Sequence, residues 1–405
     1  MRTTKTHLIV LLCCLLVTAV SPLAWGDVKE DTRPRNVRVV WLRNPSTTAT
    51  LIWDTIKPTA DNSVRIQQHG AEEARTYKAR WNESYSYADK ENVDLIYHRV
   101  LIDGLLPSTR YDVEFESDGQ KSRRMYFVSA PDDNRSMTLL FGGDSRSDQQ
   151  ARRAMNEMMA ELVTDAQATE DPSDDVVGLI HAGDYVATGT SLKEWSRWLG
   201  DHELTTAEDG RLLPIIPARG NHDRGRLFNE AFGFKIKDQH NWYGVSFGTF
   251  LRVSVLNTEA SVAGRQAKWL DEELATNRAT HRWLVAQYHR PAYAATKWPS
   301  SALIHWVPLF EKYNVDLVCE GDGHTIKRTV PIRNGKQDPT GIVYVGEGGL
   351  GVPPRMPKPK RWYLQSPGMC GAGHHVQRLR FDADKLTYEV VLLGGKIGDR
   401  WEKEK

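Results

Sequence analysis

Hydrophobic and polar positions alternate along the chain between about residues 36 and 131. Apolar side chains at every second position are typical of strands that bury one face. Asn-Pro, Asp-Asn and Asp-Gly pairs separate the alternating segments and favour tight turns. This pattern predicts an antiparallel β-sandwich. The expected strands include residues 37–41, 48–53, 97–101, 111–115 and 125–128.

The pattern changes from Met137 onward, where wholly apolar runs alternate with segments of helical periodicity. Strands that alternate with helices predict an α/β core, in which the loops after the strands carry the chemistry. Methionines at helical spacing are expected to pack on a sheet rather than to bind a ligand. The expected strands are residues 137–141, 176–180, 213–217, 283–287 and 315–319. The helical positions are Met155, Met158, Met159, Leu162 and Val163, and then Leu303, Val307 and Phe310.

Residues 1–26 have the pattern of an export signal. Arg2 and Lys5 give a basic start, an apolar stretch covers residues 8–20, and Ala24 and Gly26 offer small residues for cleavage. The alternative is an uncleaved membrane anchor, but the apolar stretch is shorter than the ~20 residues of a spanning helix. We therefore expect a secreted or periplasmic protein with no membrane anchor in its mature form.

Composition and charge are those of a soluble globular protein. The chain has 405 residues, of which 40% are hydrophobic and 26% are charged. The formal net charge of +1 gives no strong field that would attract nucleic acid, so we do not expect nucleic acid as an obligate partner. Cys319 and Cys370 could form a disulfide in an oxidising compartment. A buried thiol at Cys319 is the favoured interpretation, because this residue ends an apolar run.

Five short polar motifs follow the apolar runs, and each contains side chains that can bind a metal ion. A pair of hydrolytic ions about 3.5–4 Å apart needs a shared carboxylate and oxygen or nitrogen donors on both sides. The order of the five motifs supplies such donors and so predicts a two-metal phosphoesterase site. The motifs are GGDSR at 142–146, GDY at 183–185, GNHD at 220–223, AQYH at 286–289 and GDGH at 321–324.

The first three motifs contribute two carboxylates, one amide and one imidazole. Asp144 follows two glycines that allow a tight turn, although a lone Gly-Asp is more often only a turn. Asp184 is the candidate bridging ligand, because one carboxylate can hold both ions. The amide of Asn221 is a neutral ligand suited to an ion that also holds substrate. His222 is the candidate proton donor, and its alternative is a structural loop histidine.

The last two motifs contribute three further donors. His289 ends a strand and would complete the ligands of the second ion. His324 lies two positions after Asp322, so both side chains can point to one site. Five other histidines lack such a context and are expected to be structural or exposed. They are His181, His202, His240, His374 and His375.

The order of these motifs resembles the calcineurin-like metallophosphoesterase superfamily, and the preceding sandwich makes the chain similar to purple acid phosphatases. Their pattern is Asp-x-Gly, Gly-Asp-x-x-Tyr, Gly-Asn-His-Asp/Glu, Val-x-x-His and Gly-His-x-His. Residues 105–111 also resemble the L-x-P-x-T-x-Y corner of fibronectin type III domains. The resemblance covers about residues 34–395. It implies a fibronectin type III-like purple acid phosphatase N-terminal domain at 34–131 and a four-layer α/β/β/α metallophosphoesterase domain at 136–395.

Two departures from the family pattern concern the metal ligands. Ala187 stands where the family has its tyrosine ligand, three positions after Asp184, and Tyr185 is expected to point elsewhere. The protein is therefore expected not to be purple, and its first ion need not be iron(III). Asp322 stands where the family has a histidine, which favours manganese, magnesium or calcium at the second ion.

A third departure places Arg146 at the glycine of Asp-x-Gly. An arginine two positions from a ligand could clamp the substrate phosphate with two hydrogen bonds. The alternative is a salt bridge to Asp148 or to another nearby acid. The sequence leaves both roles open.

The resemblance implies an exported phosphoric ester hydrolase with two metal ions, drawn from iron, manganese, zinc, magnesium and calcium. A metal-bound hydroxide would attack a small-molecule phosphate ester, and His222 would protonate the leaving group. The leading hypothesis is an acid phosphatase-like phosphomonoesterase. The alternatives are a phosphodiesterase or nucleotide pyrophosphatase of the same fold, and a non-catalytic secreted relative with a decayed metal site. The expected ligands are Asp144, Asp184 and His324 for the first ion, and Asp184, Asn221, His289 and Asp322 for the second.

Overall fold

A computed structural model describes residues 31–79, 81–85, 95–168, 175–235, 238 and 240–405, with the backbone alone for 81–85. The expected export signal at 1–26 lies outside the described residues. Residues Thr32–Lys405 form one compact unit. Among the described residues, none of the helices combines the length and the apolar character that crossing a membrane requires.

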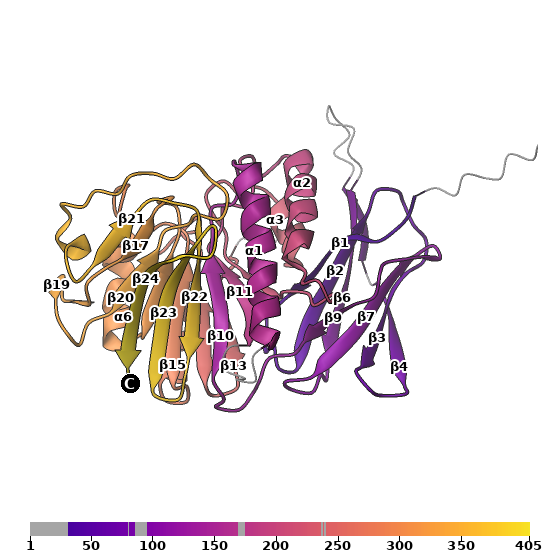
Figure 1. Ribbon diagram of the computed structural model, residues 1–405, viewed down its shortest axis with the longest axis horizontal. Coiled ribbons are helices and arrows are strands. Elements are labelled where there is room, and N and C mark those ends of the chain that lie inside the picture. Colours follow the sequence, from indigo (N-terminus) through magenta and orange to yellow (C-terminus); the bar gives the residue numbers. More distant parts are fainter. Residues whose placement is uncertain (1–30, 80, 86–94, 169–174, 236–237, 239) are drawn as a thin grey trace, which may run out of the picture. The chain divides into compact units, whose positions relative to one another are not determined.

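The N-terminal part is the expected β-sandwich of two antiparallel sheets (Figure 1). Tyr111 stabilises the L-x-P-x-T-x-Y corner at 105–111, because its hydroxyl accepts a hydrogen bond from the N–H of Leu106 at 2.7 Å. Trp53 and Phe115 fill the space between the sheets, with ring centroids 5.2 Å apart. One sheet contains β1 (Arg35–Val40), β2 (Thr48–Thr55), β5 (Trp81–Tyr85) and β6 (Leu95–Asp103). The other contains β3 (Asn62–Gln68), β4 (Ala74–Lys78), β7 (Arg110–Ser117), β8 (Gln120–Lys121) and β9 (Met125–Val128).

Two further sets of strands build the core of the α/β part. In each set, neighbouring parallel strands end at the same edge, as strands buried on both faces do in α/β folds. The first set contains β10 (Met137–Gly142), β11 (Val176–His181), β12 (Ile215–Pro217), β22 (His375–Phe381), β23 (Lys385–Leu392) and β24 (Ile397–Glu404). The second contains β13 (Tyr243–Phe247), β14 (Leu251–Val255), β15 (Trp283–Tyr288), β16 (Leu317–Glu320), β17 (Ile326–Arg328), β20 (Val343–Gly346) and β21 (Met369–Gly371).

The side chains of these strands separate four layers. Leu139 of β10 and Val285 of β15 lie in one hydrophobic cluster between the two sheets. Leu140, next to Leu139, points the other way into a cluster with the first group of helices. Leu284, next to Val285, points into a cluster with the second group. The first group is α1 (Gln149–Ala168), α2 (Leu192–His202) and α3 (Leu227–Phe232), and the second is α4 (Arg265–Arg278), α5 (Ala302–His305) and α6 (Val307–Lys312). The predicted fold, a sandwich followed by an α/β/β/α core, is confirmed.

The sandwich and the α/β core share a sheet. Strand β1 lies parallel to β12, with Val40 opposite Ile215, and the N–H of Trp41 donates to the carbonyl of Ile215 at 3.0 Å. The resulting sheet has ten strands in the order β24-β23-β22-β10-β11-β12-β1-β2-β6-β5. The domain limits 34–131 and 136–395 stay predictions, because backbone hydrogen bonds join the two parts.

Two local expectations had different outcomes. The helical positions around Leu303 and Val307 lie in two short helices rather than one, because Pro308 has no N–H to donate to the preceding turn. Cys319 is a fully buried free thiol, as favoured. Cys370 is also free, because its strand β21 lies three strands from β16, about 14 Å at ordinary strand spacing.

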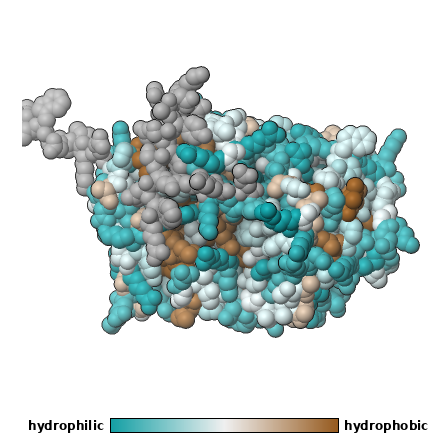
Figure 2. Space-filling view, turned by 180° about the vertical axis from the view of Figure 1, so that it is seen from behind, coloured by the Kyte–Doolittle hydropathy of each residue, from teal (hydrophilic) through white to brown (hydrophobic). Residues whose placement is uncertain are grey.

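The face opposite to that of Figure 1 is mainly hydrophilic (Figure 2). Brown side chains occur there in a few separate groups, the largest beside the grey residues. Among the described residues, the most exposed large apolar side chains are Trp298, Met356 and Ile304, at 86%, 80% and 72%. All three belong to the α/β part of the chain.

Candidate metal centre

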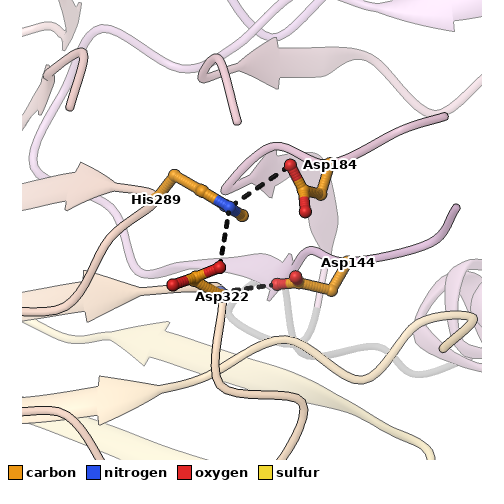
Figure 3. Close-up of side chains that lie close together, drawn as sticks. All are labelled: Asp144, Asp184, His289 and Asp322. Carbon is orange, nitrogen blue, oxygen red and sulfur yellow. Dashed lines mark hydrogen bonds and ion pairs between the residues drawn. The ribbon is translucent and has the colours of Figure 1, made fainter. Parts of the chain in front are cut away.

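The polar motifs meet where parallel strands of the two sheets end. Asp144 follows β10 and Asp184 follows β11 in the first sheet. His289 follows β15 and Asp322 follows β16 in the second sheet. These four side chains point toward one another, and one donor atom of each lies within 4.8 Å of the others (Figure 3). All four are buried.

The backbone at this edge adopts left-handed conformations that side chains other than glycine rarely take. Asp144, Asp184, Asp322 and His324 have φ angles of 54°, 60°, 70° and 58°. Such conformations cost free energy and persist only when the surrounding structure imposes them. Each of the four turns sends a potential metal ligand into the same space.

Close contact between two loops requires glycine at position 220. A Cβ atom built on Gly220 would lie 2.2 Å from the N atom of Asp184 and 2.3 Å from its Oδ1 atom. No other residue type can stand there without moving the Asp184 loop. The glycine therefore brings Asn221 beside the carboxylate of Asp184.

The donors expected for the second ion surround the Nε2 atom of His289. This atom lies 3.1 Å from Oδ1 of Asn221, 3.3 Å from Oδ1 of Asp184 and 3.5 Å from Oδ1 of Asp322. Donors bound about 2.1 Å from one ion are about 3.0 Å apart when adjacent in an octahedron and about 3.4 Å apart in a tetrahedron. The three distances from His289 Nε2 are therefore those of donors that could share one ion.

The orientation of His289 agrees with such a role. Its Nδ1–H donates to the carbonyl oxygen of Ala182 at 2.9 Å, so Nε2 faces the carboxylates. Burial opposes protonation, but the charges of Asp184, Asp322 and Asp144 raise the pKa of His289 well above its ordinary value. For Asp184 and Asp322, burial is outweighed by His289 and other donors, and the pKa of each carboxyl falls well below its ordinary value. The carboxylates around His289 therefore stabilise a positive charge placed among them.

The donors expected for the first ion also meet. Oδ1 of Asp144 lies 3.3 Å from Nε2 of His324 and, although fully buried, accepts no hydrogen bond within the described part of the chain. Oδ2 of Asp144 accepts a hydrogen bond from the N–H of Asp322 at 2.8 Å. A buried carboxylate oxygen without a hydrogen bond is costly unless a cation lies beside it.

Arg146 contacts the same group of donors. Its Nε lies 3.2 Å from Oδ2 of Asp184, and its Nη2 lies 3.5 Å from Nε2 of His324. The Arg146 side chain is only 14% exposed. One alternative from the sequence was a salt bridge from Arg146 to Asp148 or to another nearby acid. In the structure, Arg146 forms a salt bridge with Asp184.

His222 stands at the edge of the cluster. Its backbone N–H donates to Oδ1 of Asp184 at 2.9 Å. Its Nδ1–H donates to the carbonyl of Ala187 at 2.7 Å, since a carbonyl oxygen can only accept. The side chain is half-buried. The Nε2 atom therefore points away from the Ala187 loop and takes no part in the hydrogen bond of Nδ1.

Two residues of the site have functions that sequence reasoning did not assign. Asp223 is buried and accepts hydrogen bonds from the N–H groups of Asp184, Tyr185 and Gly220 at 2.8, 2.9 and 2.8 Å. It holds two ligand loops together, and its place in the GNHD motif was the available signal. Lys297 lies 2.5 Å from Oδ1 of Asp322, a contact for which the sequence offers no signal.

Tyr185 points away from the metal cluster, as expected. Its ring is fully buried in the helix layer, stacked on His181 at 4.0 Å and edge-on to Trp198 at 4.9 Å. Its hydroxyl donates to the carbonyl of His181 at 3.4 Å. Ala187 has no side-chain donor atom; its backbone N–H donates to Glu194 and its carbonyl accepts from His222. No phenol oxygen of the described residues lies among the contacts of Asp184 and His324.

Comparison with known proteins agrees with this architecture. Residues 150–326 match the calcineurin-like phosphoesterase family, and residues 34–129 match the purple acid phosphatase N-terminal domain. The solved structure of a purple acid phosphatase from yellow lupin (Lupinus luteus) seeds superposes with a TM-score of 0.74 at 16% sequence identity. The superposition covers 92% of this chain and 74% of the lupin chain.

Two curated relatives are similar over most of the chain. Human acid phosphatase type 7 is 24% identical over 364 residues, which cover 76% of this chain and 79% of the human protein. An uncharacterized protein of Mycobacterium tuberculosis is 23% identical over 357 residues, or 78% of this chain. The match covers 63% of the mycobacterial protein, so this chain spans less than two thirds of that relative. The family uses a dinuclear metal centre. With both models matched in order along the chain, the chain combines a purple acid phosphatase N-terminal domain with a calcineurin-like metallophosphoesterase domain.

Proposed function

We propose that this protein is an exported, metal-dependent hydrolase of small-molecule phosphoric esters, most similar in activity to an acid phosphatase. One observation carries the proposal: buried oxygen and nitrogen donors from both sheets converge at the spacings that a bound ion requires. Export, to the periplasm or outside the cell, rests on the signal pattern at residues 1–26. The similarity to human acid phosphatase type 7 supports the class of reaction.

The proposed metal ligands are the six side chains of the converging loops. Metal ions bound there would neutralise charge on the phosphoryl oxygens and lower the pKa of a bound water. Iron, manganese, zinc, magnesium and calcium all accept the oxygen and nitrogen donors present. The ligands are Asp144, Asp184, Asn221, His289, Asp322 and His324.

Two further side chains are proposed to act on the substrate itself. Arg146 presents a planar guanidinium that can donate two hydrogen bonds to phosphate oxygens. His222 would donate a proton from Nε2 to the departing oxygen, while its Nδ1–H stays bonded to the carbonyl of Ala187. The backbone bond from His222 to Asp184 keeps the imidazole beside the metal ligands.

A non-catalytic relative with a decayed metal site is the second candidate. The observation that favours it is that Arg146 and Lys297 already pair with the carboxylates of Asp184 and Asp322. Against it, Asp144 keeps a buried oxygen that accepts no hydrogen bond from the described residues, and Asp144, Asp184, Asp322 and His324 all keep left-handed backbones. A phosphodiesterase or pyrophosphatase would use the same residues and differs only in the substrate.

Metal reconstitution followed by an assay tests the proposal. The protein is stripped with a chelator, reloaded separately with Mn²⁺, Zn²⁺ and iron, and assayed with p-nitrophenyl phosphate and bis(p-nitrophenyl) phosphate. We expect metal-dependent turnover, with the monoester as the better substrate. A faster reaction on the diester would favour the phosphodiesterase. A protein that binds no metal and stays inactive under all three conditions would instead favour the non-catalytic relative.

A further inference from the structure

The side chain of Arg146 lies where the first ion is expected. That ion would be held by Asp144, Asp184 and His324, and the Arg146 guanidinium contacts two of these three residues. Nε is 3.2 Å from Asp184 Oδ2 and Nη2 is 3.5 Å from His324 Nε2. An ion bound to the same Oδ2 and Nε2 atoms would lie next to a positive charge, and two cations on one pair of donors repel each other.

Burial makes this repulsion hard to avoid. The Arg146 side chain is 14% exposed and its partner carboxylate is 1% exposed, so little water screens the charge. The first-ion group has only two anionic donors, Asp144 and Asp184, because Ala187 offers no side-chain oxygen and Tyr185 is buried in the helix layer.

The second ion has four donors and a more exposed cation beside them. Asp184 and Asp322 supply two carboxylates, and Asn221 and His289 supply two neutral donors. The cation that pairs with a carboxylate of this group is Lys297, whose side chain is 40% exposed and lies on the loop before α5. A flexible, partly exposed ammonium group can move into water when an ion binds, whereas the enclosed guanidinium of Arg146 has less room to leave.

We infer that the guanidinium of Arg146 takes the place of the first of the family's two ions. The chain then binds one ion tightly, among Asp184, Asn221, His289 and Asp322, and presents a fixed organic cation on the other side of Asp184. Arg146 neutralises phosphate oxygens there with N–H donors instead of by coordination. This inference rests on the proposed function and changes the number of ions that it needs.

Asp144 and His324 keep a positioning role in this arrangement. Asp144 Oδ2 accepts from the N–H of Asp322 and so fixes the loop that carries a ligand of the tight ion. His324 lies 3.3 Å from Asp144 Oδ1 and 3.5 Å from Arg146 Nη2, between the carboxylate and the guanidinium. Removing the guanidinium would leave Asp144, Asp184 and His324 with free donor atoms, which is the arrangement of an ion site.

Metal counting in the full-length protein tests the inference. Wild type, Arg146→Gly, Arg146→Gln and Arg146→Lys are stripped, reloaded with excess Mn²⁺, freed of unbound ions and measured by elemental analysis. We expect about one ion per chain in wild type and in Arg146→Lys, and about two in Arg146→Gly. Arg146→Gln removes the charge at similar volume and is expected to gain the second ion as well. Thermal unfolding of each variant verifies that it is folded.

Electron paramagnetic resonance gives a second readout that does not depend on activity. A single Mn²⁺ gives an isolated-ion spectrum, whereas two adjacent Mn²⁺ ions are coupled and broaden it. We expect the isolated spectrum in wild type and the coupled one in Arg146→Gly. Two ions in wild type, or one ion in every variant, would overturn the inference and leave the proposed function intact. No ion in any variant would overturn the proposed function as well.

Discussion

The carboxylate of Asp223 and the backbone N–H of Asp184 form a 2.8 Å hydrogen bond that joins two ligand loops. The same carboxylate accepts from Gly220, the residue before Asn221. Burial, together with the charge of Asp184, raises the pKa of Asp223 to about 7. Asp223 is fully buried, and its effect is to set the distance between the Asp184 and Asn221 loops.

Asp223→Asn is expected to weaken metal binding. An asparagine side chain has one acceptor oxygen, and its NH₂ group would face backbone N–H groups that also donate. Loss of a residue that orients metal ligands typically costs about 10–100-fold in metal affinity or activity. Titration with Mn²⁺ should show a weaker dissociation constant for Asp223→Asn, while Asp133→Asn, in the segment between sandwich and core, should behave as wild type. Equal affinities in both variants would show that Asp223 has only a folding role.

His222→Ala and Asp184→Ala are expected to fail in different ways. Asp184 supplies a carboxylate to the donors grouped around His289 Nε2, so its removal should lower metal content. His222 contacts Asp184 only through its backbone N–H, which alanine retains, so metal content should stay near that of wild type. Elemental analysis of both variants, with His69→Ala in the sandwich as a control, measures this difference. Metal loss in His222→Ala would place His222 among the ligands.

The leaving group distinguishes a proton donor from a binding residue at position 222. General acid catalysis is typically worth about 10²–10⁴-fold, and it matters most when the departing oxygen is basic. His222→Ala should therefore slow hydrolysis of an alkyl phosphate far more than that of p-nitrophenyl phosphate, whose phenolate departs unaided. Steady-state kcat for the two substrates gives the comparison. Equal losses on both would contradict the proton-donor role.

An iron-loaded sample is expected to lack the colour of purple acid phosphatases. That colour needs a phenol oxygen on ferric iron, and Ala187 supplies none. Tyr185 cannot replace it without leaving a stack with His181 and contacts with Trp198, and burial raises the pKa of its phenol well above the ordinary value. A visible absorption spectrum of the iron-loaded protein, with Tyr185→Phe as a control, makes the measurement. A strong band in the green that disappears in Tyr185→Phe would show that Tyr185 binds the iron.

The sequence predicted the parts of this fold that depend on local pattern. Alternation predicted the sandwich strands, and apolar runs ending in Asp144, Asp184 and His289 predicted which loops would converge. The parallel pairing of β1 with β12 left no such signal, because it depends on backbone hydrogen bonds between segments about 175 residues apart. The pairing of Arg146 with Asp184 was one of two open alternatives, since a side chain's direction after a turn depends on the packing around it.

The contact of Lys297 with Asp322 could not be predicted from the sequence either. It lies in a loop 25 residues before Asp322, and neither its spacing nor its neighbours indicate that it would reach a metal ligand. The contact exists because β15 and β16 lie side by side and end at the same edge. Charges that adjust a metal site therefore become visible only once strand neighbours are known.

Buried His98 is expected to make the stability of the protein depend on pH. Burial lowers the pKa of His98 to about 4, against the opposing charge of Asp118, while the unfolded chain keeps a value of about 6.5. Between pH 6.5 and pH 4 the unfolded state binds a proton that the folded state does not. The contribution of buried, neutral His98 to the free energy of unfolding is therefore fully present above pH 6.5. It is lost as the pH falls toward 4, by up to about 1.4 kcal/mol per pH unit and about 3 kcal/mol in all.

Comparison with His98→Gln isolates this contribution from the other buried groups. Asp223 and Glu347, whose pKa values are raised to about 7, act in the opposite direction, so the wild-type curve alone does not identify His98. Both proteins retain these carboxyls, and glutamine can still donate to the hydroxyl of Thr55, which lies 3.0 Å from His98 Nε2. Urea unfolding at pH 7, 6 and 5 should show the free energy of unfolding falling more steeply in wild type than in His98→Gln, by about 2 kcal/mol over the two pH units. Parallel curves would mean that His98 is protonated in the folded protein, which its enclosure beside Trp53 opposes.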